Sequence, residues 1–483
     1  MPKQAPEIQL AGIEIPDRSG QAKYRHLAEA LRQRILDGRL SPGTRLPASR
    51  VFAAQLQVSR NTVLQAFTGL IAEGYLTGKP GSGTFVTDSL PEAFLHSQPA
   101  APELDRQSPL PTDDPPQELE LRPFRCGAPS LQDFPFALWT RVLSRQSRRL
   151  PFQAFGYGDP GGYPPLRRAV AEYLSTARAV RCQAEQILIV NGSQQAIDLC
   201  GRVLLGKEDV VWFEDPGYPA AKDCFQRTGA RLFPVTVDRN GMQVELAQRQ
   251  CPQAKLAYLT PSHQFPLGHS LSLSRRMQLL DWANRNGAWL LEDDYDSEYR
   301  FSGPPLASMQ GLDRNDRVLY MGTFSKVFFP ALRLGYLVLP PPLVDEFQEA
   351  KQLADRGCSL LEQAALAEFL EQGHFARHLR KMRLLYHRRQ LALAAAARQR
   401  LPAEFRLQIS HGGMHALLWL PPGENDRQVA ERARQAGFQV EALSNYRLKS
   451  TGLPALLLGF AAFSEAQIQA GMESLATRVL LPV

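Results

Sequence analysis

Apolar residues recur along the chain with two different spacings. Tyr24, Leu27, Leu31 and Ile35 are three or four positions apart, which is typical of one helix face, and Gly38 can end that helix. Beyond residue 120, short apolar runs alternate with helical patterns. The runs are ILIV (187–190), DVVWF (209–213), KLAYLT (255–260), AWLLE (288–292) and RVLYMG (317–322). This alternation predicts an α/β domain with a largely parallel sheet, in which ligands bind beyond the carboxyl ends of the strands.

A proline-rich stretch separates the two regions. Residues 88–122 contain seven prolines and almost no apolar periodicity, which is typical of an extended linker. We therefore expect a multidomain protein with a small domain over residues 1–87, a linker over 88–122 and a large domain over 123–483. The large domain is expected to divide into an α/β core over about 150–345 and a smaller C-terminal subdomain over about 346–483.

Two helices in quick succession are predicted within RLPASRVFAAQLQVSRNTVLQAFTGLIAEGYL. Ser49 can cap the first and Ser59 the second, QLQV leaves only a tight turn between them, and Gly74 ends the second helix. Four residues of the second helix are expected to face the core of this small domain: Val63, Leu64, Phe67 and Leu70.

The second helix of this pair begins with side chains suited to phosphates and base edges, Arg60, Asn61 and Thr62. The following TGKPGSGTFV (77–86) predicts a β-hairpin, or wing, with Lys79 at its tip. Helix, tight turn and helix is the layout that places a second helix in the major groove of DNA. A small helical bundle with solvated arginines is the alternative interpretation of the same spacing.

Positive charge is concentrated at the N-terminal end. The chain has a net charge of +7, and residues 1–87 hold 11 Lys and Arg against 6 Asp and Glu, which is +5. A basic small domain favours a polyanionic partner, although a solvated basic surface fits these counts equally well.

Other compositional features narrow the class of protein. Hydrophobic residues make up 44% of the chain, no apolar run reaches the about 20 residues that span a bilayer, and MPKQAPEIQL lacks the apolar core of a signal peptide. We therefore expect a cytoplasmic location. The six cysteines form no CxxC pair and have no matching histidine spacing, so neither disulfides nor a metal site is expected.

The segment MGTFSKVFFPALRLGYLVLP places Lys326 in otherwise apolar surroundings. A lysine inside a core is neutralised, paired or chemically used. Thr323 and Ser325 offer hydroxyls to a phosphate, and Arg333 can add a bidentate charge. The alternative is a lysine whose amine reaches the surface from the edge of a strand.

Further candidates follow the other predicted strands. Asp293 follows the run AWLLE and could pair with the protonated nitrogen of a pyridine ring, a pyridinium. Tyr295, two residues later, could donate a hydrogen bond to a phenolic oxygen. The alternative is that this segment is an acidic loop. Ser193 and Gln194 follow ILIV in a glycine turn before a helix, which suits a phosphate. Tyr218 could stack on a ring or lie in the core. The remaining acids of EDDYDSEYR are interpreted as structural or surface groups: Glu292, Asp294, Asp296 and Glu298.

Taken together, these candidates match the needs of one cofactor. Pyridoxal phosphate requires a lysine for a Schiff base, a carboxylate for its ring nitrogen, a donor to its phenolic oxygen, an aromatic face and a phosphate cup. The sequence therefore predicts a pyridoxal-phosphate site at the strand ends.

LPASRVFAAQLQVSRNTVLQAFTGLIAEGYLTGKPGSGTFV (46–86) resembles the winged helix-turn-helix of the GntR family of bacterial transcription regulators over its whole length. The resemblance implies binding to double-stranded promoter DNA. The DNA contacts that it implies are Arg50, Arg60, Asn61, Thr62 and the wing from Lys79 to Gly83, which includes Gly81.

TFSKVFFPALRLGY resembles the SFSKxxxPGxRxG segment of fold-type I pyridoxal-phosphate enzymes, the aspartate aminotransferase family, and the likeness covers roughly residues 120–480. It implies an α/β fold-type I domain with a smaller α+β subdomain and makes Lys326 the Schiff-base lysine. AFGYGDPGGYPPLRRAVAEYL is similar to the family's dimer segment, whose tyrosine, here Tyr157, reaches the phosphate of the neighbouring subunit. The other implied roles are phosphate binding by Arg333, Ser193 and Gln194, ring-nitrogen pairing by Asp293, contact with the phenolic oxygen by Tyr295, and ring stacking by Tyr218.

A GntR-type head joined to such a body is the architecture of MocR-type regulators, and TPSHQFPLG, EDDYDSEYR and GGMHALLWL are similar to motifs of that subfamily. The resemblance implies a cytoplasmic head-to-tail homodimer that regulates transcription. We expect it to sense pyridoxal phosphate, or its aldimine with an amino compound as small-molecule effector. The alternatives are a working aminotransferase with a DNA-binding head, and a body that serves only as a dimerisation scaffold.

Three positions depart from the aminotransferase pattern. HQFPLG lacks the usual asparagine, for which His263 or Gln264 is a candidate. Leu457 stands where an arginine usually binds the substrate carboxylate, and Ala220 replaces a second arginine of some relatives, with Arg447 as a candidate substitute. Because a buried carboxylate without a charge partner is costly, we expect the ligand to be the cofactor itself or an amine without that carboxylate geometry, with little turnover.

Overall fold

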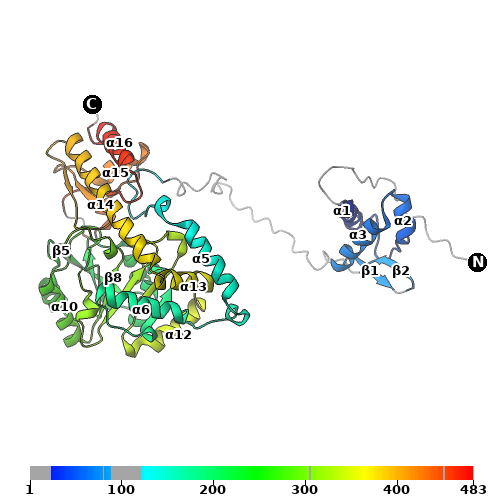
Figure 1. Cartoon of the computed structure of the whole chain (residues 1–483), viewed down its shortest axis with the longest axis horizontal. Coiled ribbons are helices and arrows are strands. Elements are labelled where there is room, and N and C mark those ends of the chain that lie inside the picture. The colour runs from blue at the N-terminus through cyan, green and yellow to red at the C-terminus, as the bar shows by residue number, and fades with distance from the viewer. Residues whose placement is uncertain (1–22, 80, 89–120, 304–305, 450–451, 482–483) are drawn as a thin grey trace, which may run out of the picture. The chain divides into compact units, whose positions relative to one another are not determined.

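The computed structural model describes residues 23–79, 81–88, 121–303, 306–449 and 452–481 (Figure 1). Contacts divide the chain into two units, Met1–Pro115 and Pro116–Val483, which are treated separately below. Most of the predicted linker, residues 89–120, lies outside the described residues.

The N-terminal unit contains three helices and a hairpin. Its elements are α1 (Lys23–Leu36), α2 (Ser49–Gln55), α3 (Arg60–Ala72), β1 (Leu76–Lys79) and β2 (Gly83–Val86). The strands pair antiparallel with Leu76 opposite Val86, which confirms the predicted hairpin. The helices pack on a core that includes Leu27, Leu31, Ile35, Phe52, Val63, Phe67 and Leu70.

Two local predictions in this unit have different outcomes. Ser59 caps α3 as predicted, with its side chain accepting a hydrogen bond from Thr62 N at 3.0 Å. Ser49 is the first helical residue of α2 instead of its cap, because Ala48 takes that position. Leu64 is 41% exposed, so its predicted core position was wrong, and Ala66 takes the place on the buried face.

An eight-stranded sheet forms the centre of the larger unit. Its strands are β3 (Ile187–Val190), β4 (Val210–Asp215), β5 (Arg231–Asp238), β6 (Gly241–Met242), β7 (Leu256–Leu259), β8 (Trp289–Asp294), β9 (Val318–Thr323) and β10 (Gly335–Val338). Their order is β3-β10-β9-β8-β7-β4-β5-β6. β5, β4, β7, β8 and β9 run parallel, whereas β10 is antiparallel to both of its neighbours and β6 is antiparallel to β5. The five apolar runs of the sequence are all strands of this sheet.

Helices cover both faces of the sheet, because its buried strands are apolar on both sides. Leu188 and Val190 of β3 pack with α7 (Ser193–Leu204), α8 (Pro219–Arg227) and α12 (Val344–Asp355). On the opposite face, Ile187 and Ile189 pack with α5 (Phe136–Arg149), α6 (Pro164–Arg178) and α13 (Leu360–Glu371). The same face is continued by α9 (Val244–Gln250) and α10 (Leu273–Asn286), and α10 and α6 are labelled in Figure 1.

The C-terminal part adds a smaller antiparallel sheet. It contains β11 (Arg406–Gln408), β12 (His415–Trp419), β14 (Ala455–Gly459) and β13 (Glu441–Ala442), in that order. The long helix α14 (His374–Arg400) packs with α16 (Glu465–Leu475), and α15 (Asp426–Gln435) contacts β13. The larger unit therefore combines an α/β core with a smaller α+β part, as expected from the sequence.

Two features are absent from the described part of the chain. No helix there combines the length and the apolar character needed to cross a bilayer. Within the same residues, no group of three or more His, Cys, Asp or Glu side chains is arranged to hold a metal ion.

Candidate functional site

A cavity of about 330 Å³ opens where the carboxyl ends of the strands meet the C-terminal sheet. Its walls combine residues that follow several strands, the first residue of α7, the segment before α5 and part of the C-terminal sheet. The lining residues include Ser193, Tyr218, Ala220, Tyr258, Thr260, Phe265, Asp293, Tyr295, Thr323 and Lys326, together with Cys126, Gly127, Met414, His415, Glu441 and Tyr446.

Lys326 extends into this cavity. Its Nζ donates to the carbonyl oxygen of Gly127 at 2.9 Å. A Cβ at position 127 would lie 2.8 Å from Nζ, and Gly127 has a φ of +71°, so both the close approach and the backbone conformation favour glycine here. Burial lowers the pKa of the Lys326 amine, which increases the neutral, nucleophilic fraction at a given pH. The amine is directed to the cavity, which disfavours the alternative of a lysine reaching the surface.

Asp293 lies at the end of β8 with one oxygen bonded and one free. Its Oδ2 accepts a hydrogen bond from the Tyr258 hydroxyl at 2.6 Å, whereas its buried Oδ1 has no hydrogen-bond partner within the described part of the chain. Burial raises the pKa of Asp293 to about 7, against the opposing effect of the Tyr258 bond. A cationic N–H donor at Oδ1 would satisfy this atom and favour the ionised carboxylate. The protonated ring nitrogen of pyridoxal phosphate has that chemistry, so this end of the cavity fits the cofactor.

Hydroxyls and backbone donors gather at another part of the cavity. Ser193 begins α7 after Gly192, which has a φ of +86°, so the helix N-terminus is directed toward an anion at this position. Thr323 Oγ1 accepts from the backbone N–H of Ser325 at 3.2 Å. The Ser325 Oγ, two residues further along the chain, is buried without a partner among the described residues, although Ser325 itself does not line the cavity. These groups fit a phosphate, which supplies acceptor oxygens for free donors.

Ser325 and three further predicted phosphate residues do not line the cavity in this chain. Gln194 donates to Cys224 Sγ at 2.7 Å and to the carbonyl of Ala220 at 3.3 Å. Arg333 donates to Asn191 O at 3.0 Å, and its guanidinium lies beside Gly192, behind the turn that leads to α7. Tyr157 is 89% exposed. Their phosphate contacts therefore stay predictions.

The candidates for the missing asparagine also lie outside the cavity lining. Gln264 is buried, and its Nε2 donates to Glu214 Oε2 and to the carbonyls of Pro216 and Phe265. His263 Nδ1 lies 3.0 Å from both the Tyr295 hydroxyl and Asp296 Oδ2. The ring of Phe265 occupies the cavity wall instead. His263 can therefore orient Tyr295, whereas Gln264 stabilises the backbone around Pro216 and Phe265.

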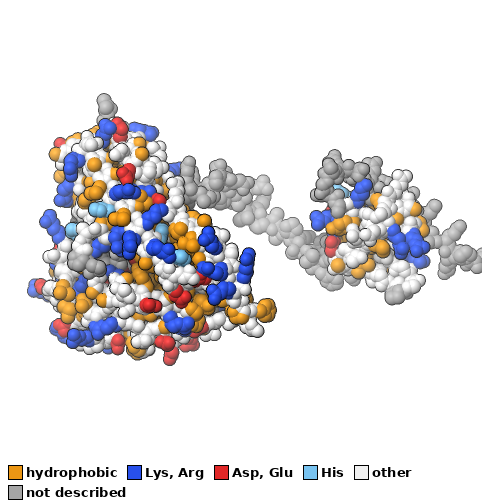
Figure 2. All heavy atoms as spheres, in the orientation of Figure 1, with side chains coloured by type: hydrophobic (Ala, Val, Ile, Leu, Met, Phe, Trp, Pro, Cys, Tyr) orange, Lys and Arg blue, Asp and Glu red, His pale blue; other side chains and the backbone are white. Residues whose placement is uncertain are grey.

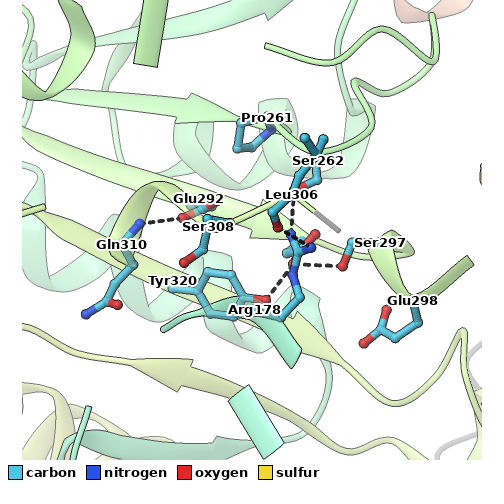
Figure 3. Close-up of polar contacts among 12 residues, drawn as sticks. Arg178, Pro261, Ser262, Glu292, Ser297, Glu298, Leu306, Ser308, Gln310 and Tyr320 are labelled. Carbon is cyan, nitrogen blue, oxygen red and sulfur yellow. Dashed lines mark hydrogen bonds and ion pairs between the residues drawn. The ribbon is translucent and has the colours of Figure 1, made fainter. Parts of the chain in front are cut away.

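The acids adjacent to Asp293 belong to a separate buried network. Arg178 donates to Asp294 Oδ2 at 2.8 Å, to Ser262 Oγ at 2.6 Å and to Leu306 O at 2.7 Å (Figure 3). Glu292 accepts from the backbone of Met309 and Gln310. Asp294 and Glu292 therefore have structural partners, as interpreted from the sequence.

Several lining residues were not identified from the sequence as site residues. Cys126, His415, Glu441 and Tyr446 come from segments on both sides of the sheet-forming region, and only the folded chain brings them together. GGMHALLWL matched a subfamily motif, but nothing in it indicated that His415 faces the cavity. Leu457 is fully buried, and among the described lining residues no arginine occurs.

The predicted DNA-contacting residues lie on the surface of the N-terminal unit. Arg50, Arg60, Asn61, Lys79 and Gly81 are exposed and Thr62 is half-buried. Arg60 and Asn61 occupy the first turn of α3, and Lys79 Nζ lies 5.3 Å from the centre of the Phe85 ring in the hairpin. Figure 2 shows the Lys and Arg side chains on the visible surface of each unit. The three-helix unit with its wing therefore presents polar and basic groups at the start of α3, where such folds contact DNA.

Comparison with protein families gives two matches. The family "Bacterial regulatory proteins, gntR family" matches residues 23–86, and "Aminotransferase class I and II" matches residues 133–475.

Individual relatives combine both parts. The chain is 39% identical to the probable rhizopine catabolism regulatory protein MocR of Rhizobium meliloti, over 95% of this chain and 94% of that protein. It is 33% identical to the pyridoxine biosynthesis transcriptional regulator PdxR of Corynebacterium glutamicum, over 91% of this chain and 92% of that protein. One similar solved structure is that of LysN, an α-aminoadipate aminotransferase of Thermus thermophilus, complexed with N-(5'-phosphopyridoxyl)-L-leucine. It matches with a TM-score of 0.68 and 30% identity, over 73% of this chain and 90% of that one.

Proposed function

Since the chain belongs to the MocR-type transcription regulators, in which a GntR-family DNA-binding region is joined to an aminotransferase class I and II domain, we propose that its promoter binding responds to pyridoxal phosphate or to an amino compound bound beside it. The family establishes a DNA-binding regulator with a pyridoxal-phosphate domain. The proposal adds which residues hold the cofactor and how its binding is sensed.

The pairing of Lys326 with Asp293 in one cavity carries this proposal. When bound, pyridoxal phosphate supplies an aldehyde carbon that reacts reversibly with primary amines. Lys326 offers a buried amine with a lowered pKa, and Asp293 offers an unpartnered oxygen for the ring nitrogen. Two independent requirements of the same cofactor are thus met by side chains that converge on one space.

The remaining cofactor contacts follow from the lining of the cavity. Ser193 and Thr323 of the lining would hold the phosphate, with Ser325, Gln194 and Arg333 as further phosphate ligands from outside the lining. Tyr218 would stack on the ring. Tyr295, held by His263, would donate to the phenolic oxygen.

A head-to-tail homodimer would complete the phosphate site. Phe152 and Tyr157, in the segment between α5 and α6, are 88% and 89% exposed, which is unusual for large side chains in a monomer. We propose that Tyr157 reaches the phosphate of the partner subunit. Tyr157→Phe is then expected to weaken cofactor affinity about tenfold, in line with the loss of one hydrogen bond to a charged group.

Sensing requires that the bound ligand favour one arrangement of the protein over another, since equal affinity for both shifts nothing. Lys326 is placed to respond, because its amine is bonded only to Gly127 O in the described structure. A primary amine that competes with Lys326 for the cofactor would release this side chain and alter the cavity wall that contains Gly127.

Footprinting of the full-length protein on its adjacent promoter tests the proposal. We expect pyridoxal phosphate to change the protected region with the wild type and to leave it unchanged with Lys326→Ala. In parallel, pyridoxal phosphate mixed with the wild type should show an absorbance band that is missing when it is mixed with Lys326→Ala. Identical footprints with and without cofactor, or identical spectra of both proteins, would refute the proposal.

Catalytic turnover is a second candidate, because Lys326 and Asp293 are retained together. Incubation of the cofactor-loaded protein with a panel of amino acids, followed by assay of keto acid over many turnovers, separates the two functions. We expect no sustained keto acid production, since none of the described lining residues is an arginine that could bind a substrate carboxylate.

A further inference from the structure

The C-terminal sheet contributes a negatively charged wall to the cavity. Glu441 of β13 lines the cavity together with His415 and Tyr446. Its carboxylate accepts a hydrogen bond from the Tyr446 hydroxyl, which brings no charge. Among the described lining residues, the only Lys or Arg is Lys326.

The register of the sheet leaves Glu441 without a cation on the neighbouring strand. Glu441 is paired with Leu457 of β14 in an antiparallel ladder, so the two side chains project from the same face of the sheet. Leu457 is fully buried with Leu417, Leu443 and Tyr446 in an apolar cluster. This wall of the cavity therefore presents the Glu441 carboxylate next to apolar side chains.

Glu441 acts on the same part of the cavity as Lys326. After burial, the charge of Glu441 is the largest influence that raises the pKa of Cys126, to about 12, while the charge of Lys326 opposes it. Cys126 thus lies within the fields of both groups and stays a neutral thiol. Of the other acids in the lining, Asp296 is paired with His263 at 3.0 Å and Asp293 is proposed to bind the ring nitrogen.

This arrangement selects the charge of the ligand. A ligand carboxylate on this wall would meet Glu441 with no positive side chain to offset the repulsion, and like charges in a desolvated site are strongly unfavourable. A cationic group would instead donate a charge-assisted hydrogen bond to Glu441.

We propose that the effector is a compound with two basic groups, a primary amine that engages the cofactor and a second cation, ammonium or guanidinium, that binds Glu441. The inference rests on the proposed function, in which the cavity holds pyridoxal phosphate and admits an amino compound. It goes beyond that function by assigning the chemical class of the effector to diamines and their guanidino analogues. Amino acids with a carboxylate at that position are excluded.

A ligand panel on the cofactor-loaded full-length protein provides the test. Diaminoalkanes of increasing chain length are compared with monoamines of the same length and with the corresponding ω-amino acids, by calorimetry and by the absorbance of the bound cofactor. We expect the best diamine to bind at least about tenfold more tightly than its monoamine, the gain of one charge-assisted bond, with the ω-amino acid weakest.

Substitution of Glu441 links the preference to this side chain. Glu441→Gln keeps the shape and the bond from Tyr446, and it should bind diamine and monoamine about equally. Glu404→Gln, which changes an exposed carboxylate in the turn before β11, should behave as the wild type.

The outcomes separate this inference from the proposed function. If no cofactor signal appears before any amine is added, the proposed function fails. If the signal is present but the wild type prefers ω-amino acids or monoamines, or if Glu441→Gln retains the diamine preference, the inference on the effector is overturned. The wild-type panel decides the charge preference even if the variant does not fold.

Discussion

Two adjacent aspartates at the end of β8 face opposite sides of the sheet, since successive residues of a strand alternate. Asp294 has a cationic partner: its Oδ2 accepts from Arg178, from the Tyr320 hydroxyl at 2.5 Å and from Ser297 Oγ at 2.9 Å. Asp293 has no ion pair among the described residues and only the Tyr258 hydroxyl as donor. One carboxylate is thus paired with a cation within the fold, whereas the other lines the cavity without one among the described residues.

The difference shows how a functional acid can be separated from a structural one. Both are buried and both belong to the same acidic run. Burial of a charge without a partner is costly, so burial raises the pKa of such a carboxyl group unless a cation offsets the cost. Each aspartate has one buried oxygen without a partner among the described residues, so the open oxygen alone does not separate them. What separates them is that Asp293 lines the cavity and has no cationic partner there, whereas Asp294 is bonded to the buried Arg178.

The largest effect is expected when the Arg178 network is broken. Arg178→Met keeps an aliphatic side chain but leaves Asp294 buried without its cation, and removal of one partner of a buried pair typically costs about 3–5 kcal/mol. The free energy of unfolding from urea titrations of the cofactor-free protein should fall by that amount.

Arg202→Met is the matched control for this change. Arg202 pairs with Asp198 on the exposed surface of α7, and exposed pairs of this kind contribute about 0.5 kcal/mol or less. Equal losses for both variants would show that the Arg178 network does not carry the stability assigned to it.

Asp293→Asn tests the aspartate that lines the cavity, through the pH dependence of the free energy of unfolding. Because the folded pKa of Asp293 is raised to about 7 from 3.8, its contribution to stability is fully present below pH 3.8 and is lost as pH rises to about 7. The difference corresponds to at most about 4 kcal/mol. The cofactor-free variant should therefore exceed the wild type in stability increasingly between pH 5 and about pH 7.5, while its affinity for pyridoxal phosphate decreases.

Glu214→Gln distinguishes loss of charge from loss of a ligand contact. Burial also raises the pKa of Glu214 to about 7, but its carboxylate accepts from Thr260 and Gln264 and does not line the cavity. We expect this variant to change the pH dependence of unfolding and to leave cofactor affinity unaltered. If cofactor affinity fell equally in both variants, Asp293 would have no special role.

The same contrast explains what could be predicted from the sequence. Lys326, Asp293 and Tyr218 each follow a recognisable apolar strand, and strands in a parallel sheet bring their carboxyl ends together, so their convergence was foreseeable. The winged helix-turn-helix was foreseeable for a different reason, because its contacts are short-range in the sequence.

Other features depend on packing that no local pattern encodes. Cys126 and Glu441 reach the cavity only when the segment before α5 and the C-terminal sheet close against the strand ends. Gln194 lies in the predicted turn, yet its side chain bonds to Cys224 on α8 instead of lining the cavity. Side-chain direction at a turn is set by tertiary neighbours, which spacing along the chain does not reveal.

The smallest effect, and the most specific, is expected from a pair of serines. Ser325 Oγ is buried with no partner among the residues that the structure describes, so Ser325→Ala should change the unfolding free energy of the cofactor-free protein by less than about 0.5 kcal/mol, because no hydrogen bond is lost. Its affinity for pyridoxal phosphate, measured by equilibrium dialysis, should fall roughly tenfold if the hydroxyl donates to the phosphate. Ser297 Oγ donates to Asp294, so Ser297→Ala should cost about 1 kcal/mol of stability and leave that affinity unchanged. The opposite result would be that Ser325→Ala lowers stability and Ser297→Ala lowers cofactor affinity. It would mean that a buried hydroxyl without a hydrogen-bond partner does not identify the ligand-binding side of the sheet.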